Sequence, residues 1–195
     1  MEYSAGIVST LFWFVETKEI ARLLQNRSLE EVERLVFEDN ILQQKKPEHI
    51  RKEFNCIMKR LNALPENLKS EFVDTDVDSA KLIAMIGVMA TDQLLFEFIY
   101  EVYREKIRME ETELEDKDFN IFFNDKTFQS EKVASWSEAG IKKMKQSYRR
   151  YMFEAGLLED TKSKKIKKVY LDKEIREILE LNNMQQYIYA LTGER

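Results

Sequence analysis

The stretch VASWSEAGIKKMKQSYRRYMFEAGLLEDTKSKKIKKVYL, residues 133–171, determines how the rest of the chain is interpreted. Ser137 stands directly before a helical pattern and is the predicted N-cap of that helix. The apolar positions of the helix recur every three or four residues: Ile141, Met144, Tyr148, Met152 and Ala155. Gly156 favours the left-handed conformation that ends many helices. The stretch therefore predicts one amphipathic helix with a marked start and a marked end.

The predicted helix carries a cationic face. At about 100° per residue, four polar side chains fall together away from the apolar stripe: Lys142, Lys145, Gln146 and Arg149. Amide and guanidinium groups are donors suited to reading base edges in the major groove, so Gln146 and Arg149 are the predicted base contacts. Ser137, Lys143 and Arg150 complete the DNA contacts predicted for this helix.

A lysine-rich segment, Thr161–Lys168, follows the glycine. Leu157–Leu158 and Val169–Leu171 are short apolar runs that we expect to pair as a hairpin. Its polar connection holds five candidate phosphate contacts: Lys162, Lys164, Lys165, Lys167 and Lys168. Helix, glycine and basic hairpin in this order are typical of a winged helix-turn-helix. The alternative is a solvated surface helix followed by a disordered polar loop.

Composition and charge distribution support a helical protein with one cationic surface. Of 195 residues 34% are charged, and only 5 are glycine and 2 proline, which favours a mostly helical chain. The formal net charge is −5, yet residues 141–168 hold ten Lys or Arg and three acids, a local charge of +7. The remainder then carries −12. A bipolar molecule of this kind presents its basic surface to phosphate and turns its acidic body away.

A second, weaker basic element lies in the N-terminal half. Ser28 and Glu31 have the spacing of a capping box, and Pro47 suits the first position of a later helix. That helix and the connection before it carry five further candidate DNA contacts: Lys45, Lys46, Arg51, Lys52 and Lys59. The pattern fits a second helix-turn-helix, but plain packing of three helices explains it equally well.

The fold expected from these patterns is all-α, with at most one short β-hairpin wing, in two small lobes that each hold a helix-turn-helix-like element. A helix buried on most sides is predicted from Ala80 to Ala90. The acidic run Glu110–Asp118 is the predicted boundary, which gives lobes 1–109 and 110–195, although the same run could equally start a helix. Just after it, four phenylalanines are expected to pack a short helix: Phe119, Phe122, Phe123 and Phe128.

Catalytic and metal-binding patterns do not emerge from the sequence. The only histidine, His49, and the only cysteine, Cys56, do not provide a zinc site or a catalytic triad, and no phosphate-binding glycine loop is present. The acidic turn of Asp74, Asp76 and Asp78 is interpreted as capping rather than as a Mg²⁺ site. We therefore expect no enzyme activity, no metal and no cofactor. The cysteine content, the lack of a leader and the short apolar runs predict a reduced cytoplasmic protein without a membrane span.

The sequence resembles the BrxA family, the small accessory proteins of the BREX bacteriophage-exclusion systems. The resemblance rests on Tyr3–Gly6, the helix Glu16–Leu24, Ser28 and Glu31 with Asn40, Lys59–Leu61, and above all VASWSEAGIKKMKQ running into EAGLLE. It implies an all-helical, largely monomeric, two-lobed protein that has two helix-turn-helix elements and binds double-stranded DNA. The implied DNA role carries over to Ser137, Lys142, Lys143, Lys145 and Gln146.

Two functions follow from the residues and the resemblance together. The first is a non-enzymatic double-stranded DNA-binding subunit of a BREX system, motivated by the +7 segment. The second is an adaptor that docks onto larger defence proteins through its acidic body, with incidental DNA contact. Other BREX proteins are the expected partners in either case.

Overall fold

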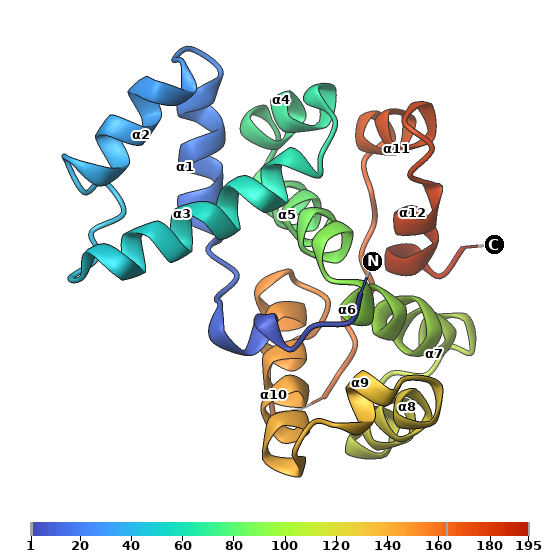
Figure 1. The fold of residues 1–195 in the computed structure, drawn as a ribbon. Helices are drawn as coiled ribbons and strands as arrows, with labels where there is room; N and C mark the ends of the chain where they lie inside the picture. Colours follow the sequence, from blue (N-terminus) through green and yellow to red (C-terminus); the bar gives the residue numbers. More distant parts are fainter. Residues whose placement is uncertain (1, 163, 195) are drawn as a thin grey trace. The chain divides into compact units, whose positions relative to one another are not determined.

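The computed structural model describes residues 2–162 and 164–194, and their regular secondary structure is helical (Figure 1). Within these ranges β-pairing is confined to two isolated antiparallel bridges, Glu113 with Lys165 and Leu158 with Ile166. The predicted all-α fold class is confirmed.

The chain folds into two compact units, which are described separately. Unit 2 comprises residues 12–91, and unit 1 combines residues 2–11 with the chain from Asp92 onward. The lobes predicted from the sequence, 1–109 and 110–195, stay a prediction.

Unit 2 is built from five helices whose ends follow local sequence signals (Figure 1). They are α1 (Phe14–Leu24), α2 (Leu29–Phe37), α3 (Pro47–Asn62), α4 (Glu66–Asp74) and α5 (Val77–Thr91). The predicted capping box is confirmed, because Glu31 N donates to Ser28 Oγ at 3.3 Å while Ser28 N donates to Glu31 Oε2 at 2.8 Å. Pro47 occupies the first turn of α3, also as predicted.

Helix α5 is the core of unit 2. Its residues 82–89 are all buried, which confirms the prediction of a helix that is enclosed on most sides. At Gly87 an added Cβ would lie 3.2 Å from the backbone oxygen of Arg60. Glycine thus permits a close approach of α3 and α5. The Arg60 side chain is buried as well, and it donates to Phe12 O at 2.8 Å.

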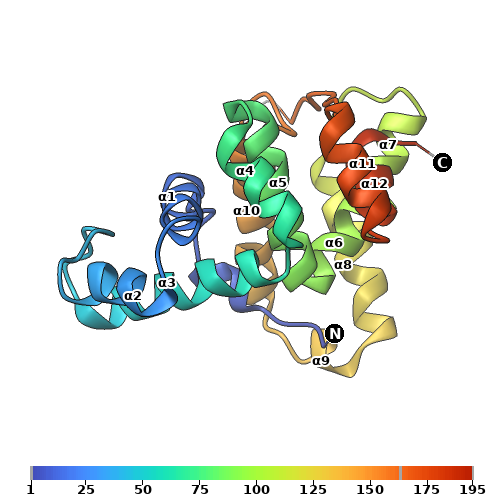
Figure 2. The ribbon, with the colours of Figure 1, turned by 90° about the horizontal axis from the view of Figure 1, so that it is seen from above.

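Unit 1 holds the longest helix of the chain, α10, together with several shorter ones (Figure 2). Its elements are η1 (Gly6–Ser9), α6 (Gln93–Phe98), η2 (Ile99–Tyr103), α7 (Arg104–Arg108), α8 (Asp116–Gln129), α9 (Glu131–Ala134), α10 (Glu138–Glu154), α11 (Lys173–Leu181) and α12 (Gln185–Thr192). Helices α6 and α7 are joined through η2, a π-helical turn.

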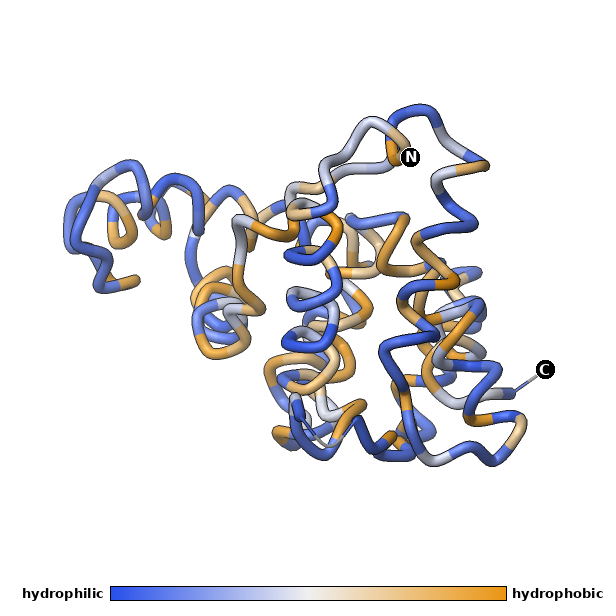
Figure 3. Tube along the Cα trace, turned by 90° about the horizontal axis from the view of Figure 1, so that it is seen from below, coloured by the Kyte–Doolittle hydropathy of each residue, from blue (hydrophilic) through white to orange (hydrophobic). Residues whose placement is uncertain are grey.

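An aromatic cluster fixes the positions of α6, α8 and α10 in unit 1. The Phe98 ring stacks on Phe119 with centroids 4.5 Å apart, and Tyr148 lies 5.5 Å from Phe98 and 5.6 Å from Phe123. All four side chains are buried. Hydrophobic and hydrophilic residues alternate along the helices, as the hydropathy colouring of Figure 3 shows. Such interlocked rings hold α8 and α10 at a defined spacing.

The N-terminal segment of unit 1 is tied to these helices by polar contacts. The Tyr3 hydroxyl donates to Glu97 Oε2 at 2.7 Å, and Arg150 Nη2 donates to Thr10 O at 2.8 Å. Glu97 also accepts from the buried Lys126 at 2.6 Å. These bonds tie the segment to α6 and α10.

No single helix among the described residues is long and apolar enough to cross a bilayer. Helix α5 and the run Gln93–Arg108 reach that length and composition only when they are counted together across the break that separates them.

Candidate nucleic-acid interface

Serine caps set the start of each helix that leads into the predicted interface. Ser130 Oγ accepts from Val133 N at 3.4 Å at the start of α9, and Ser137 Oγ accepts from Gly140 N at 3.1 Å at the start of α10. Gly156 has φ +81° just after α10. The predicted cap, span and glycine stop of this helix are confirmed. The role shown for Ser137 is that of a backbone cap, and its DNA contact stays a prediction.

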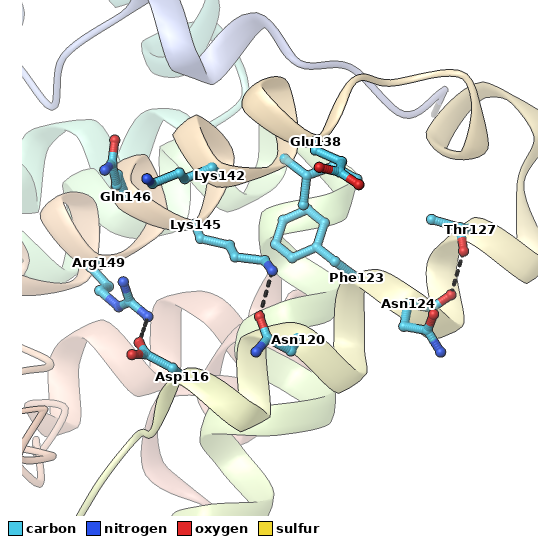
Figure 4. A pocket seen from close by; sticks show the side chains of 11 residues that line it. Asp116, Asn120, Phe123, Asn124, Thr127, Glu138, Lys142, Lys145, Gln146 and Arg149 are labelled. Atoms are coloured by element: carbon cyan, nitrogen blue, oxygen red, sulfur yellow. Dashed lines mark hydrogen bonds and ion pairs between the residues drawn. The ribbon is translucent and has the colours of Figure 1, made fainter.

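Helices α8 and α10 enclose a groove of about 550 Å³, called here the α8–α10 groove (Figure 4). All four residues of the predicted cationic face line it: Lys142, Lys145, Gln146 and Arg149. The opposite wall comes from α8 and includes Asp116, Asn120 and Asn124. The structure therefore brings the predicted cationic residues together, and it places polar and acidic groups in front of them.

Two of these cations are engaged within the protein. Lys145 Nζ donates to Asn120 Oδ1 at 2.6 Å, and the Arg149 guanidinium pairs with the Asp116 carboxylate. Figure 4 shows both side chains reaching across to α8, whereas Gln146 points away from it. Arg149 also lies over the Phe119 ring, with 4.4 Å from guanidinium carbon to centroid. These contacts hold both side chains in the groove.

Asp116 is the electrostatic centre of the groove. A hydrogen bond from Lys164 Nζ, at 3.2 Å, and the charges of Arg149 and Lys164 lower the pKa of Asp116. Burial and the charge of Arg149 lower the pKa of Lys145. The carboxylate thus joins α10 to the lysine-rich segment. Sequence reasoning missed this role, because Asp116 was interpreted as part of an acidic boundary.

The freely exposed donors of α10 are a smaller set than predicted. Lys142, Lys143 and Gln146 are exposed, and the ion pairs of the described residues include neither lysine. Arg150 is half-buried, donates to Thr10 O, and lies 3.8 Å from Glu154. Its side chain holds the N-terminal segment in place.

The lysine-rich segment pairs differently from the prediction. Lys167 N donates to Leu157 O at 2.9 Å, and Leu158 bridges Ile166, so the partner of Leu157–Leu158 is 165–167 and not Val169–Leu171. The physical reason is a second neighbour: Ile166 N donates to Thr112 O at 2.8 Å, which fixes this segment on both sides. Lys164 is half-buried, and the other four lysines are exposed: Lys162, Lys165, Lys167 and Lys168.

The second predicted set lies on and before α3 in unit 2. All five side chains are exposed: Lys45, Lys46, Arg51, Lys52 and Lys59. Arg51 lies 5.6 Å from the Phe37 ring centroid, and Lys59 Nζ donates to Thr91 O at 3.3 Å. Their DNA contact stays a prediction.

A metal site finds no support among the described residues, which contain no group of three or more His, Cys, Asp or Glu side chains placed to hold an ion. His49 is exposed, as expected from its place in the first turn of α3. Burial raises the pKa of Cys56, which is the opposite of what an activated thiol requires.

Comparisons with known proteins give a consistent result. The family model BrxA matches residues 1–183. A BREX protein BrxA from Bacillus cereus (strain H3081.97) is 37% identical over 98% of this chain and 97% of its own length. A BREX protein BrxA from Escherichia coli O9:H4 (strain HS) is 24% identical over 92% of this chain and 85% of its own length. An uncharacterized protein from Magnetospirillum magneticum, known from a crystal structure, has the same fold, with a TM-score of 0.81 and 21% identity over the whole of both chains.

Proposed function

Since the chain belongs to the BrxA family, we propose that it is a non-enzymatic accessory protein of a BREX phage-defence system and that it acts by binding double-stranded DNA. The observation that carries the DNA-binding proposal is the cationic wall of the α8–α10 groove together with the lysine-rich segment bonded beside it. Basic side chains gathered on one surface are the electrostatic footprint of a phosphate-binding protein.

The order of elements supports a winged-helix mode of binding. Helices α8, α9 and α10 follow one another, and the extended segments 157–159 and 164–167 come next with 112–114 bonded beside them. In such proteins the last helix of the motif enters the major groove. We assign α10 to that role and the lysine-rich segment to the wing.

The contacts divide into two kinds. Lys142, Lys143 and Gln146 are exposed on α10 and are the proposed first contacts with the duplex. Lys145, Arg149 and Lys164 bind DNA after exchanging Asn120 and Asp116 for phosphate or base acceptors, because a guanidinium binds both carboxylate and phosphate. The exposed lysines of the wing bind phosphates: Lys162, Lys165, Lys167 and Lys168. Ser137 and Arg150 support this surface through the helix cap and the N-terminal segment.

Unit 2 supplies a second proposed contact. The five exposed cations on and before α3 are suited to phosphates, and no acidic side chain pairs with them in the described residues. This contact is independent of α10 and is tested separately by substitution of Lys52 and Lys59.

The experiment that tests the proposal is duplex binding across a salt series, with Lys142→Glu and Lys143→Glu combined. Each lost phosphate contact lowers the slope of log affinity against log salt by about 0.9, so the double variant should lose about 1.8. Lys173→Glu, an exposed lysine at the start of α11, is the matched control and should keep the slope. Equal slopes for the wild type and the double variant contradict the proposal.

A further inference from the structure

Helix α8 has a second groove on the face opposite to the α8–α10 groove. Residues 116, 120, 123, 124 and 127 line the first, whereas residues 118, 121, 122, 125 and 129 line the second. At about 100° per residue these two sets lie roughly 180° apart around the helix. The second groove, called here the acidic groove, has a volume of about 300 Å³, and its other wall comes from η2 and α7.

The acidic groove leaves large apolar side chains in contact with solvent. Met109 is 68% exposed and Ile121 is 59% exposed, and Val102 and Phe122 complete the apolar lining. Phe128, two turns beyond Ile121 on α8, is 83% exposed. The sequence predicted that Phe128 packs inside, and this prediction is wrong. Met109 and Ile121 thus expose apolar surface in one groove, and exposed apolar surface gathered in this way is typical of a protein interaction site.

The lining of the acidic groove is rich in carboxylates. Five carboxylates and one lysine line it: Glu101, Glu105, Glu111, Asp118, Asp125 and Lys106. Lys106 is buried, and although burial lowers its pKa, hydrogen bonds to Glu111 and Asp118 raise it overall. Lys106 therefore stays charged and is already paired with Glu111 and Asp118. Glu105 pairs with Arg108 at 2.7 Å and with Arg104 at 3.2 Å. Asp125 is exposed and has no ion-pair partner among the described residues, and Glu101 and Glu111 keep 47% of their side chains exposed beside their lysine partners.

We propose that the acidic groove binds a basic amphipathic helix of a protein partner. Both walls are helices with internally bonded backbones, so the groove has no free strand edge to which an extended peptide could add. The apolar floor accepts the apolar face of such a helix, and the carboxylates pair with Lys or Arg beside that face. Charge complementarity selects this partner over an acidic segment and over nucleic acid.

This inference is independent of DNA binding, because α8 presents the two grooves on opposite faces. The DNA duplex and the protein partner would therefore contact different residues of α8. A contact of this kind gives an accessory protein a means to hold another protein close to DNA.

The test uses a labelled synthetic amphipathic peptide of leucine and lysine, and its leucine and glutamate counterpart, with the full chain. The lysine peptide should bind and the glutamate peptide should not. Ile121→Ser combined with Asp125→Lys should weaken binding of the lysine peptide by about tenfold. Phe153→Ser, which changes an exposed aromatic residue on α10, is the matched control and should bind like the wild type.

Duplex affinity, measured on the same variants, keeps failure of this proposal distinct from failure of the proposed DNA-binding function. The double variant retains the cationic wall of α10 and should bind duplex at least as well as the wild type. The proposal is overturned if both peptides bind alike, or if the double variant binds the lysine peptide as tightly as the wild type does. It is also overturned if sedimentation shows self-association that depends on Ile121, because a second copy of the chain would then be the occupant.

Discussion

Replacement of Asp116 by Asn should increase affinity for duplex DNA. The Asp116 carboxylate holds two cations of the proposed DNA surface, Arg149 through an ion pair and Lys164 at 3.2 Å. In the proposed complex, a DNA phosphate would replace this carboxylate as the partner of both cations. A neutral amide releases both cations, and two further phosphate contacts steepen the slope of log affinity against log salt by up to about 1.8. At low salt the affinity should therefore rise by about tenfold or more.

The assay is fluorescence anisotropy of a labelled duplex across a salt series, with Asp125→Asn as the matched control. Both variants remove one exposed carboxylate from α8, but Asp125 faces the acidic groove. A general gain from lower negative charge would appear equally in both variants. The reasoning is refuted if Asp116→Asn and Asp125→Asn have the same slope and affinity, or if Asp116→Asn weakens binding while thermal melting shows it folded.

Three further predictions concern stability. Burial, with a contribution from Glu16, raises the pKa of Glu53 from 4.5 to about 7, so the stability it confers is complete below about pH 4.5 and is lost as pH rises through 7. The difference in the free energy of unfolding between wild type and Glu53→Gln should therefore change by about 3 kcal/mol between these two pH values. Chemical denaturation at several pH values measures this difference, and a constant difference would show that Glu53 is not the cause. Lys126→Met should destabilise the fold by about 3–5 kcal/mol, because it leaves the Glu97 charge without this lysine in a mostly buried site. Adding Glu97→Gln should recover part of the loss. If it recovers none, the ion pair between Lys126 and Glu97 is not the cause. Ser137→Ala should cost about 1 kcal/mol by loss of the α10 cap, whereas Ser137→Asp should retain stability in the same urea titration.

The features that the sequence predicted correctly are those set by neighbouring residues. The Ser28 capping box, Pro47 at the start of α3, and the Ser137 cap with its Gly156 stop all depend on groups within a few positions of one another. Periodicity likewise identified α5 as buried, because its apolar residues cover every side of the helix.

The features that could not be predicted from the sequence depend on contacts between residues that lie far apart in the chain. Arg149 and Lys145 fall on the outer face of an isolated helix, but α8 packs beside α10 and supplies Asp116 and Asn120. The pairing of Leu157–Leu158 shifted because residues 112–114 bond to the other side of the lysine-rich segment. Phe128 was assigned to the core by its residue type, although the aromatic cluster closes without it.

The fastening of residues 3–11 has a practical consequence for handling the protein. Thr10 and Leu11 offer backbone oxygens to the side chains of Arg150 and Tyr151 on α10, and Tyr3 bonds to the same Glu97 that holds Lys126. Loss of residues 3–11 would remove these contacts with α6 and with α10, the helix proposed to enter DNA. Binding data from N-terminal fusions therefore need comparison with tag-free protein.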